Sequence, residues 1–354
     1  MLATATPTRE SLSATTGLNA QIVSVAVELA PNKFSIAEIA ERVIAESPEG
    51  ANIPVHHIAK LTGVKTVYHR DEGQDTSDLA VAAAKTALSR AGLEISDVDL
   101  LIFAAASQDL IEPATSHIVS AKLGGEQIPV FDVKNACNSF LNGVQVANAF
   151  IRSGMYRTIL VVSGEAPSIA IRWNNRDRAQ FLESFAGFSM SDAGAAMVLR
   201  VTTEPDRGVL AMGFTAASDH WNVGTLGSGG SRAPRDVEAT YFNMDGRSLA
   251  EAFLSLGPHL LNETLQSAGL AWRDFAFIGM HQVAAPYMNR ICRILKVPQD
   301  QIIETIQDYG NMTSISFPLQ LSLAMESGRV KPGDKFAFIG FAGGISTGLG
   351  VFQL

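Results

Sequence analysis

Apolar stretches of strand length alternate along this chain with segments that carry helix signals. Strands are predicted at 99–106, 129–133, 158–163, 195–201, 275–280 and 335–341. Helices are predicted at 36–46, 76–91, 114–123, 138–153, 247–268, 283–295 and 316–327. Because the strands are apolar along their whole length, both faces of a sheet should be covered by helices, which indicates an α/β fold.

Parts of the chain resemble each other, which indicates an internal repeat. Residues 87–99 and 264–276 each end a helix with a glycine, turn, and enter an apolar strand. A second pair of segments, 135–154 and 309–328, closes on Ser-Gly in both copies and sets Cys137 opposite Asn311. Two repeated units in the same order favour duplication. The identical positions of the first pair are Leu88 and Leu265, Ala91 and Ala268, Gly92 and Gly269, Leu93 and Leu270, and Asp97 and Asp274.

Length and composition fit two fused units. The 354 residues are ample for two cores, and 47% hydrophobic against 18% charged residues requires extensive burial. We expect a loose N-terminal extension at 1–19 and a first half at 20–203 that carries Cys137. A second half at 204–354 carries the other candidate site residues.

Charge and motif content argue against several classes of protein. A net charge of −8 disfavours nucleic acid as a partner, and no long uncharged apolar run predicts a membrane span. The polar N-terminal stretch lacks the apolar core of a signal peptide, and the two cysteines have unrelated contexts, so a reducing cytoplasm is expected. Phosphate-loop, dinucleotide and metal-ligand spacings are missing from the sequence, so we expect no cofactor and no metal.

Cys137 is the first candidate for chemistry. It follows the apolar strand at 129–133 and a short turn, and it precedes a helix rich in small residues. The partial positive charge at a helix start favours the thiolate, which is the nucleophilic form of cysteine. The alternative is an inert buried thiol, for which Cys292 in the run MNRICRIL has the typical setting.

Three further features lie where strands end or helices begin. His281 follows the apolar strand FAFIGM, and ligands gather at such strand ends in α/β proteins, although a histidine that caps a helix is the alternative. Asn311 could donate an amide hydrogen bond to a substrate oxygen or simply cap the next helix. The glycine-rich loop at 343–350 could bring backbone N–H groups close to a ligand or form a plain tight turn.

Together these motifs resemble the β-ketoacyl-acyl-carrier-protein synthase III group of the thiolase superfamily. The resemblance covers roughly residues 20–354, and the ordered cysteine, histidine and asparagine are its most specific part. The matching segments are Asp75–Ala80, Asp132–Phe140, Asp192–Ala195, Met244–Arg247, His281-Gln282, Tyr309–Pro318 and Phe341–Gly348.

The resemblance implies a five-layered αβαβα body of two duplicated halves, usually a homodimer. It also implies an acyltransferase of fatty-acid-like or specialised polyketide biosynthesis. In such an enzyme Cys137 takes the acyl group of a thioester, and the N–H groups of Cys137 and Gly343 form the oxyanion hole. His281 and Asn311 would stabilise the enolate of a decarboxylating malonyl thioester, so that a Claisen condensation gives a β-ketoacyl thioester. The substrates would be thioesters of acyl-carrier protein or coenzyme A.

Several positions depart from the pattern of the group. Asn138-Ser139 replaces a Ser-Gly pair, which could reshape the acyl channel, and residues 283–287 lack the expected Ala-Asn. His57 and Leu61 stand where tryptophan and arginine contact the nucleotide of coenzyme A, so acyl-carrier protein becomes the favoured donor. Arg247 is a candidate carrier or substrate contact. Arg172, Arg176 and Arg178 are further candidates, although a solvated basic loop is the plainer interpretation of their segment.

Glu112 supports an alternative reaction. The segment DLIEPATS resembles a loop that reaches toward the neighbouring subunit's acyl channel in enzymes that join two acyl chains head to head. There the glutamate would remove an α-proton without decarboxylation, because burial raises the pKa of a carboxyl group. A solvated residue before a helix is the plainer interpretation. Acyl transfer to an alcohol or amine, or a non-catalytic partner subunit, are further alternatives.

Overall fold

The computed structural model describes residues 17–354, and β1 (Asn19–Leu29) is its first element. The predicted extension at 1–19 therefore lies outside the described residues except for its last three positions, and Asn19 already belongs to a strand. No helix within 17–354 is both long enough and apolar enough to cross a membrane.

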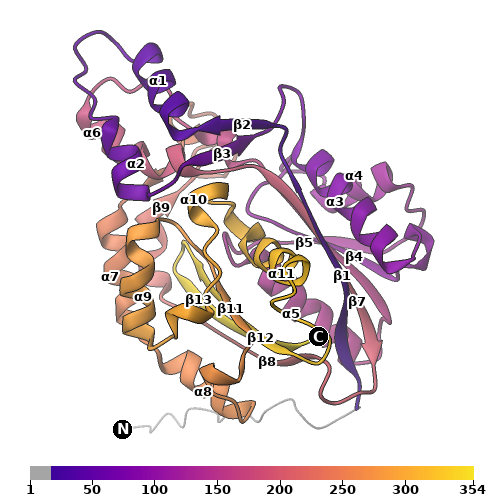
Figure 1. The fold of residues 1–354 in the computed structure, drawn as a ribbon. Coiled ribbons are helices and arrows are strands. Elements are labelled where there is room, and N and C mark those ends of the chain that lie inside the picture. Colours follow the sequence, from indigo (N-terminus) through magenta and orange to yellow (C-terminus); the bar gives the residue numbers. More distant parts are fainter. Residues whose placement is uncertain (1–16) are drawn as a thin grey trace, which may run out of the picture.

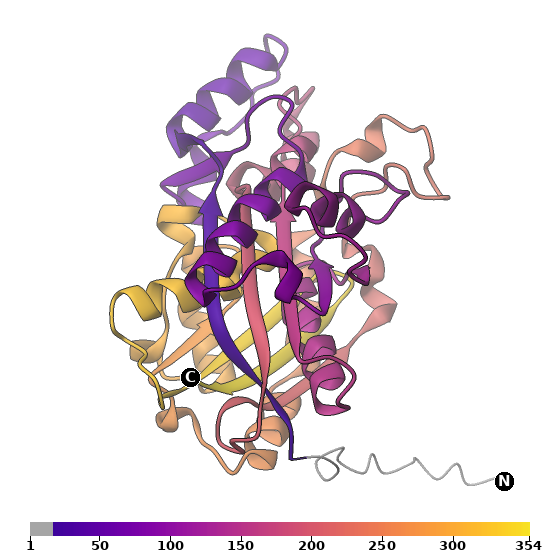
Figure 2. The ribbon, with the colours of Figure 1, turned by 90° about the vertical axis from the view of Figure 1, so that its right-hand side faces the viewer.

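The first sheet has the strand order β1-β7-β6-β4-β5. Its other strands are β7 (Ala193–Thr202), β6 (Thr158–Glu165), β4 (Leu100–Ala104) and β5 (Val130–Val133). Strand β7 runs antiparallel to both neighbours, whereas β6, β4 and β5 are parallel. Helices α3 (Thr76–Ala91) and α4 (Thr115–Leu123) cover its outer face, onto which Figure 2 looks.

The second sheet has the order β11-β12-β13-β8. Its strands are β11 (Phe277–Met280), β12 (Lys335–Ala342), β13 (Ser346–Gln353) and β8 (Gly208–Ala216). Helices α8 (His259–Ser267) and α9 (Ala285–Leu295) pack on its outer face, and α7 (Gly246–Leu256) lies beside them. An isolated β-bridge between Ile278 and Ile302 places the segment around Ile302 beside β11, as a fifth position at the edge of this sheet.

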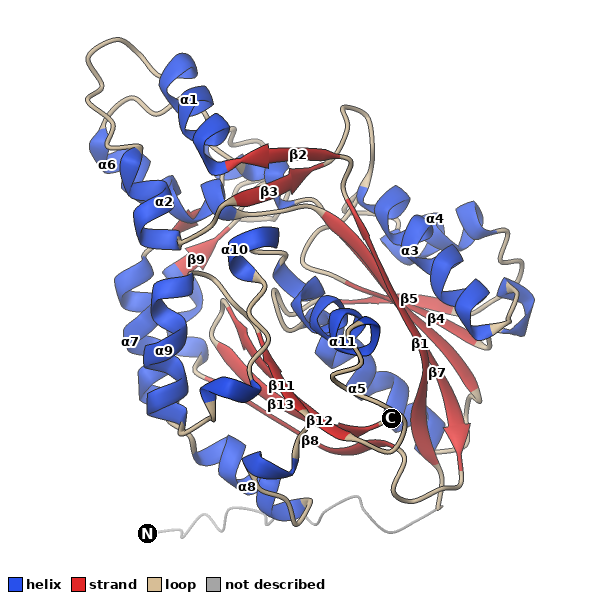
Figure 3. Ribbon diagram, viewed as in Figure 1, coloured by secondary structure: helices blue, strands red, loops and turns tan. Residues whose placement is uncertain are grey.

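Two helices fill the space between the sheets, as Figures 1 and 3 show. These are α5 (Ser139–Arg152) and α11 (Ser316–Glu326). The ring of Phe317 on α11 lies 4.8 Å from that of Phe338, 5.2 Å from Phe352 and 6.2 Å from Phe140 on α5, centroid to centroid. The result is the five-layered αβαβα arrangement, and the expected fold class is confirmed.

Both sheets follow one topology. In each, an N-terminal strand lies at the edge (β1 or β8), the last strand pairs with it (β7 or β13), and a parallel set follows. Helices α5 and α11 occupy equivalent places after the fifth position of each sheet. The division of the chain at 203/204 remains a prediction.

A smaller group of elements lies at one end of the layered body (Figure 1). It consists of β2 (Asn32–Ser35), α1 (Ile36–Glu46), α2 (His56–Thr62), β3 (Thr66–His69) and α6 (Arg178–Ser184). The remaining strands and α-helix are β9 (Gly224–Thr225), β10 (Asn243–Met244) and α10 (Ile306–Tyr309).

Two predicted elements differ from the structure. The single helix expected at 247–268 is interrupted, because Gly257 adopts a φ of 58° and Pro258 has no backbone N–H to continue the helix. The glycine-rich loop expected at 343–350 is a short turn followed by β13. Its later glycines admit aromatic rings, since a Cβ at Gly348 would lie 2.5 Å from Phe214.

Candidate active site

Cys137 lies in the tight turn between β5 and α5. The preceding residue, Ala136, adopts a left-handed φ of 45°, which turns the chain sharply before the helix. The hydroxyl of Ser139 holds this turn, since it donates to the Ala136 carbonyl at 2.7 Å and accepts from the Asn135 N–H at 2.8 Å. The turn therefore presents Cys137 at the start of α5.

Asn311 occupies the equivalent turn of the second half. Gly310, opposite Ala136 in the repeat, also has a positive φ, of 70°. The Asn311 N–H donates to the Ser189 carbonyl at 2.7 Å, and the Ser191 N–H donates to the Asn311 carbonyl at 2.9 Å. Its side chain is buried, and Oδ1 accepts from the Thr313 N–H at 3.0 Å. The Nδ2 group, on the opposite side of the carboxamide, can therefore donate to another acceptor.

His281 lies directly after β11, as predicted. Its N–H donates to the Ile339 carbonyl at 2.9 Å, which continues the pairing of β11 with β12. The ring nitrogen Nδ1 lies 3.0 Å from the Ser316 hydroxyl, while Nε2 is buried without a hydrogen-bond partner among the described residues. One ring nitrogen is therefore held by a hydrogen bond, and the other can accept from or donate to a substrate.

The segment Thr313–Ser314 brings these side chains together. Thr313 donates its N–H to Asn311, and its carbonyl accepts from the Ser316 hydroxyl, which also lies 3.0 Å from Nδ1 of His281. The Ser314 hydroxyl donates to the buried carboxylate of Glu165, whose charge acts on the Cys137 thiol. His281 and Asn311 are therefore tied to one short segment, which Glu165 connects to Cys137, although the three residues lie far apart in the sequence.

Burial raises the pKa of the Cys137 thiol to about 12, and the Glu165 charge adds to the rise. The thiolate that the helix start was expected to favour is therefore not the ground state of the free protein, and that expectation was wrong. Burial outweighs the helix end here. A base is needed to remove the thiol proton.

Burial lowers the pKa of His281 to about 4, so the ring is neutral at pH 7. A neutral ring can accept a proton at Nε2 when its own proton is on Nδ1. The hydroxyl of Ser316, which lies near both Nδ1 and the Thr313 carbonyl at 3.1 Å, can serve either tautomer. His281 therefore has the chemistry of a proton acceptor and, in the other tautomer, of a donor.

Gly343 lies in the turn between β12 and β13. A Cβ at Gly343 or Gly344 would meet no atom within 4 Å, so this turn borders open space. Among the described residues no backbone carbonyl accepts from the N–H of Gly343 or of Cys137. Two backbone donors are therefore available.

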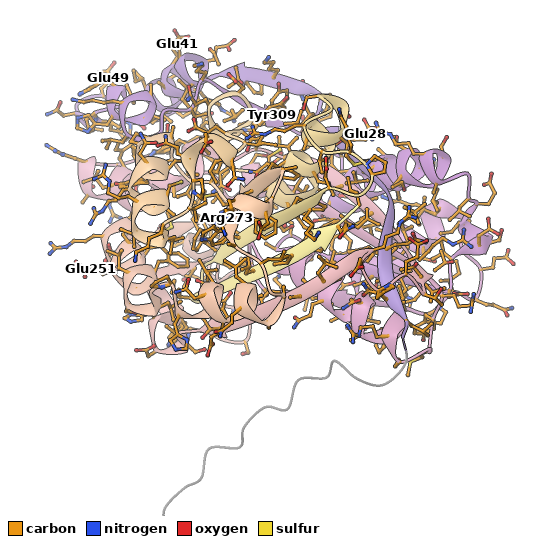
Figure 4. The ribbon with its side chains drawn as sticks, turned by 60° about the horizontal axis from the view of Figure 1, so that its bottom comes forward. Glu28, Glu41, Glu49, Glu251, Arg273 and Tyr309 are labelled. Atoms are coloured by element: carbon orange, nitrogen blue, oxygen red, sulfur yellow. The ribbon has the colours of Figure 1, made fainter. Side chains whose placement is uncertain are left out.

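The remaining predicted residues lie elsewhere. Glu112 is exposed on the loop before α4, and neighbouring Leu110 and Ile111 are also exposed, at 52% and 66%. Arg247 is exposed and pairs with Glu251 at 3.0 Å, which points outward from α7 (Figure 4).

The loop arginines differ from one another. Arg176 is exposed and lies 3.3 Å from Asp177. Arg172 is buried, pairs with Glu238 at 2.8 Å, and stacks 3.9 Å from the centre of the Tyr241 ring. Because its guanidinium is already engaged inside the protein, the structure does not present Arg172 to a carrier.

Sequence reasoning did not single out Glu165. Its carboxylate is fully buried at the end of β6 and accepts from the N–H groups of Ala106 and Ser107 at 2.8 and 3.0 Å. The available signal was an acidic residue closing an otherwise apolar strand, LVVSGE. Within residues 17–354, no group of three or more His, Cys, Asp or Glu side chains is arranged to hold a metal.

His69 and His281 should make the protein sensitive to acid. Burial lowers the pKa of His69, like that of His281, to about 4, against about 6.5 in an unfolded chain. The unfolded state then binds more protons, so stability is complete above about pH 6.5 and falls as the pH drops toward 4. Each histidine should lower the free energy of unfolding by about 2.5 kcal/mol when the pH is lowered from 7 to 4.5.

This prediction is checked by denaturant unfolding of the wild type and His69→Phe at pH 7 and 4.5. The variant should lose about 2.5 kcal/mol less on acidification. An equal loss in both proteins would contradict the assignment of a neutral buried ring at position 69.

Comparisons with known proteins agree with the fold and with the family that the sequence resembles. A model of the 3-oxoacyl-[acyl-carrier-protein (ACP)] synthase III family matches residues 131–218, and the model of its C-terminal part matches 265–354. A beta-ketoacyl-[acyl-carrier-protein] synthase III of Bordetella petrii is 30% identical over 313 residues, which are 88% of this chain and 90% of that protein. One from Neisseria gonorrhoeae is 30% identical over 298 residues, 84% and 89% of the two chains.

Solved structures show the same fold. OleA of Xanthomonas campestris, in a form with lauric acid and lauroyl-CoA bound, superposes with a TM-score of 0.84 at 25% identity, covering 95% of this chain and 99% of that one. The 3-oxoacyl-[acyl-carrier-protein] synthase III of Aquifex aeolicus has a TM-score of 0.80 at 24% identity and covers 95% and 100%.

Fold and relatives together define the class: this is a thiolase-fold acyltransferase. More narrowly, the chain belongs to the 3-oxoacyl-[acyl-carrier-protein] synthase III family.

Proposed function

We propose that this protein joins a Cys137-bound acyl group to a malonyl thioester by decarboxylative Claisen condensation. The observation that supports the proposal is the link through Thr313, which binds Asn311 through its N–H and His281 through the Ser316 hydroxyl. A nucleophile, a neutral ring and an amide donor are the groups that this chemistry requires.

Acylation comes first. His281 accepts the thiol proton of Cys137 at Nε2, and the sulfur attacks the carbonyl carbon of an acyl thioester. The N–H groups of Cys137 and Gly343 stabilise the tetrahedral oxyanion. The bond from carbon to the leaving sulfur breaks, and the departing thiolate takes the proton from His281, which leaves the acyl group on Cys137 and the ring neutral.

Condensation follows. The bond between the carboxylate and the α-carbon of the malonyl thioester breaks, and carbon dioxide leaves. The electron pair of the broken bond stays on the α-carbon and forms an enolate. For this step the ring exchanges its Nδ1 proton with solvent and takes one up on Nε2, while Nδ1 accepts from the Ser316 hydroxyl. Hydrogen bonds from His281 Nε2–H and Asn311 Nδ2 then stabilise the enolate oxygen. The α-carbon then attacks the acyl carbon on Cys137, the C–S bond breaks, and the released thiolate takes a proton from solvent.

The substrates are proposed to be thioesters of acyl-carrier protein or coenzyme A, in line with the names of the relatives. A pathway of the fatty-acid or polyketide type follows from a β-ketoacyl product. We further propose a homodimer.

Non-decarboxylative condensation of two acyl thioesters is the second candidate. It is favoured by the similarity to OleA and by Glu112, which lies beside the exposed apolar residues Leu110 and Ile111. In this reaction Glu112 removes an α-proton from one acyl thioester, and the carbanion attacks the acyl carbon on Cys137. The C–S bond to Cys137 breaks, the released thiolate takes a proton from solvent, and Glu112 returns its proton to solvent. Because Glu112 is exposed in its own chain, it would have to act in the channel of a second copy.

Product analysis with and without malonyl thioester separates the two candidates. We expect β-ketoacyl product only when malonyl thioester is supplied, with stoichiometric carbon dioxide. Glu112→Gln should then retain the wild-type rate, as should Glu126→Gln, an exposed control on the loop before β5. Product formed equally well without malonyl thioester, and lost only in Glu112→Gln, would overturn decarboxylation in favour of the second candidate.

A further inference from the structure

Asn138, the residue after the nucleophile, does not behave as its position predicts. It is the N-cap of α5, where an asparagine side chain normally accepts from an N–H of the first turn, yet it makes no such bond. The side chain is 1% exposed and reaches into the second half of the protein. There its Nδ2 donates to the Ser346 hydroxyl at 3.0 Å and to the Ser346 carbonyl at 3.3 Å.

The surroundings of Asn138 are shaped to admit this side chain. A Cβ at Gly340 on β12 would overlap Asn138 Oδ1, so the carboxamide fits only against a glycine. Asn138 Oδ1 itself is buried and accepts no hydrogen bond among the described residues. The carboxamide is therefore held in place through its Nδ2 group alone.

Ser346 is the point at which the turn containing Gly343 ends. It opens β13 and pairs with Ala342 at the end of β12, so its position sets where the intervening turn lies. On the other side, the Ile345 carbonyl accepts from the Ala217 N–H at 2.9 Å. Between these two supports, Gly343 faces open space.

From these contacts we infer that Asn138 is a positioning residue for the oxyanion hole. By tying the nucleophile turn to Ser346, it holds the N–H groups of Cys137 and Gly343 at a separation that lets both donate to one oxygen. The inference rests on the proposed function, because it concerns the acylation step at Cys137. Donors that are held in place before the reaction stabilise an oxyanion most, and a shift of one of them weakens the site.

Two reactions of the same sulfur test this role. Acylation by a thioester passes through an oxyanion, whereas alkylation by iodoacetamide displaces iodide and forms none. Asn138→Ala should slow single-turnover acylation about 10- to 100-fold, measured by intact-protein mass spectrometry, and change the alkylation rate less than about twofold. Ser346→Ala removes one of the two acceptors and should slow acylation by a smaller factor.

Asn148→Ala is the matched control, because Asn148 lies on the same helix and also has a buried Oδ1 without a partner. It should acylate at the wild-type rate. Thermal unfolding of each variant establishes whether it is folded. If Asn138→Ala does not fold, Ser346→Ala supplies the test.

The outcomes are distinct. Undiminished acylation in Asn138→Ala and Ser346→Ala, or an equal loss of acylation and alkylation, overturns the positioning role while the proposed function stands. A wild-type protein that takes up no acyl group from any thioester, although iodoacetamide labels Cys137, overturns both.

Discussion

Cys137→Ala should abolish covalent uptake of an acyl group. With the sulfur gone, the group proposed to attack the thioester carbonyl is missing, and the acyl group has no thiol at this position to which it can transfer. Loss of a nucleophile of this kind typically lowers the rate by about four to six orders of magnitude. Intact-protein mass spectrometry after incubation with a panel of acyl thioesters should show an adduct on the wild type and none on the variant.

Cys292→Ala is the control for this result. Cys292 is the other cysteine of the chain, and it lies on the buried face of α9. Its replacement should leave the adduct in place. An adduct of undiminished yield on Cys137→Ala that disappears in Cys292→Ala would reverse the assignment of the nucleophile.

Local signals explain which elements the sequence predicts well. Helix α1 has the predicted bounds, because Ser35 and Glu38 form a capping box at its start. Strands β4 and β6 are buried on both faces, so their uninterrupted apolar runs identify them.

The missed elements depend on partners that lie far away in the chain. β1 begins within a segment that looks polar, yet it pairs with β7 along its length. β13 is rich in glycine because Phe214 and Phe352 occupy the space above Gly348 and Gly350, which no local pattern reveals.

The same limit applies to the site. Cys137, His281 and Asn311 stand at strand ends and helix starts, so position and motif order were enough to propose them. The raised pKa of Cys137 was not predictable, because it depends on burial and on Glu165, whose place beside the thiol is set by packing. The hydrogen bond from Asn138 to Ser346 joins residues 208 positions apart in the sequence, and it forms only in the folded chain.

Asn311→Ala should separate the two steps of the reaction. The carboxamide is proposed to act on the enolate oxygen and not on the acyl group of Cys137. Self-acylation should therefore stay within about threefold of wild type, while condensation should fall about 10²- to 10³-fold, the usual cost of one such donor. The measurement pairs adduct formation by mass spectrometry with the rate of β-ketoacyl product.

Two comparisons sharpen this prediction. His281→Ala should slow both steps, because the ring accepts the thiol proton in the first and donates to the enolate in the second. Asn289→Ala, at an exposed position on α9, should change neither. If Asn311→Ala loses acylation as fully as condensation, the amide supports the nucleophile or the fold of its turn, and the enolate role proposed for Asn311 is wrong.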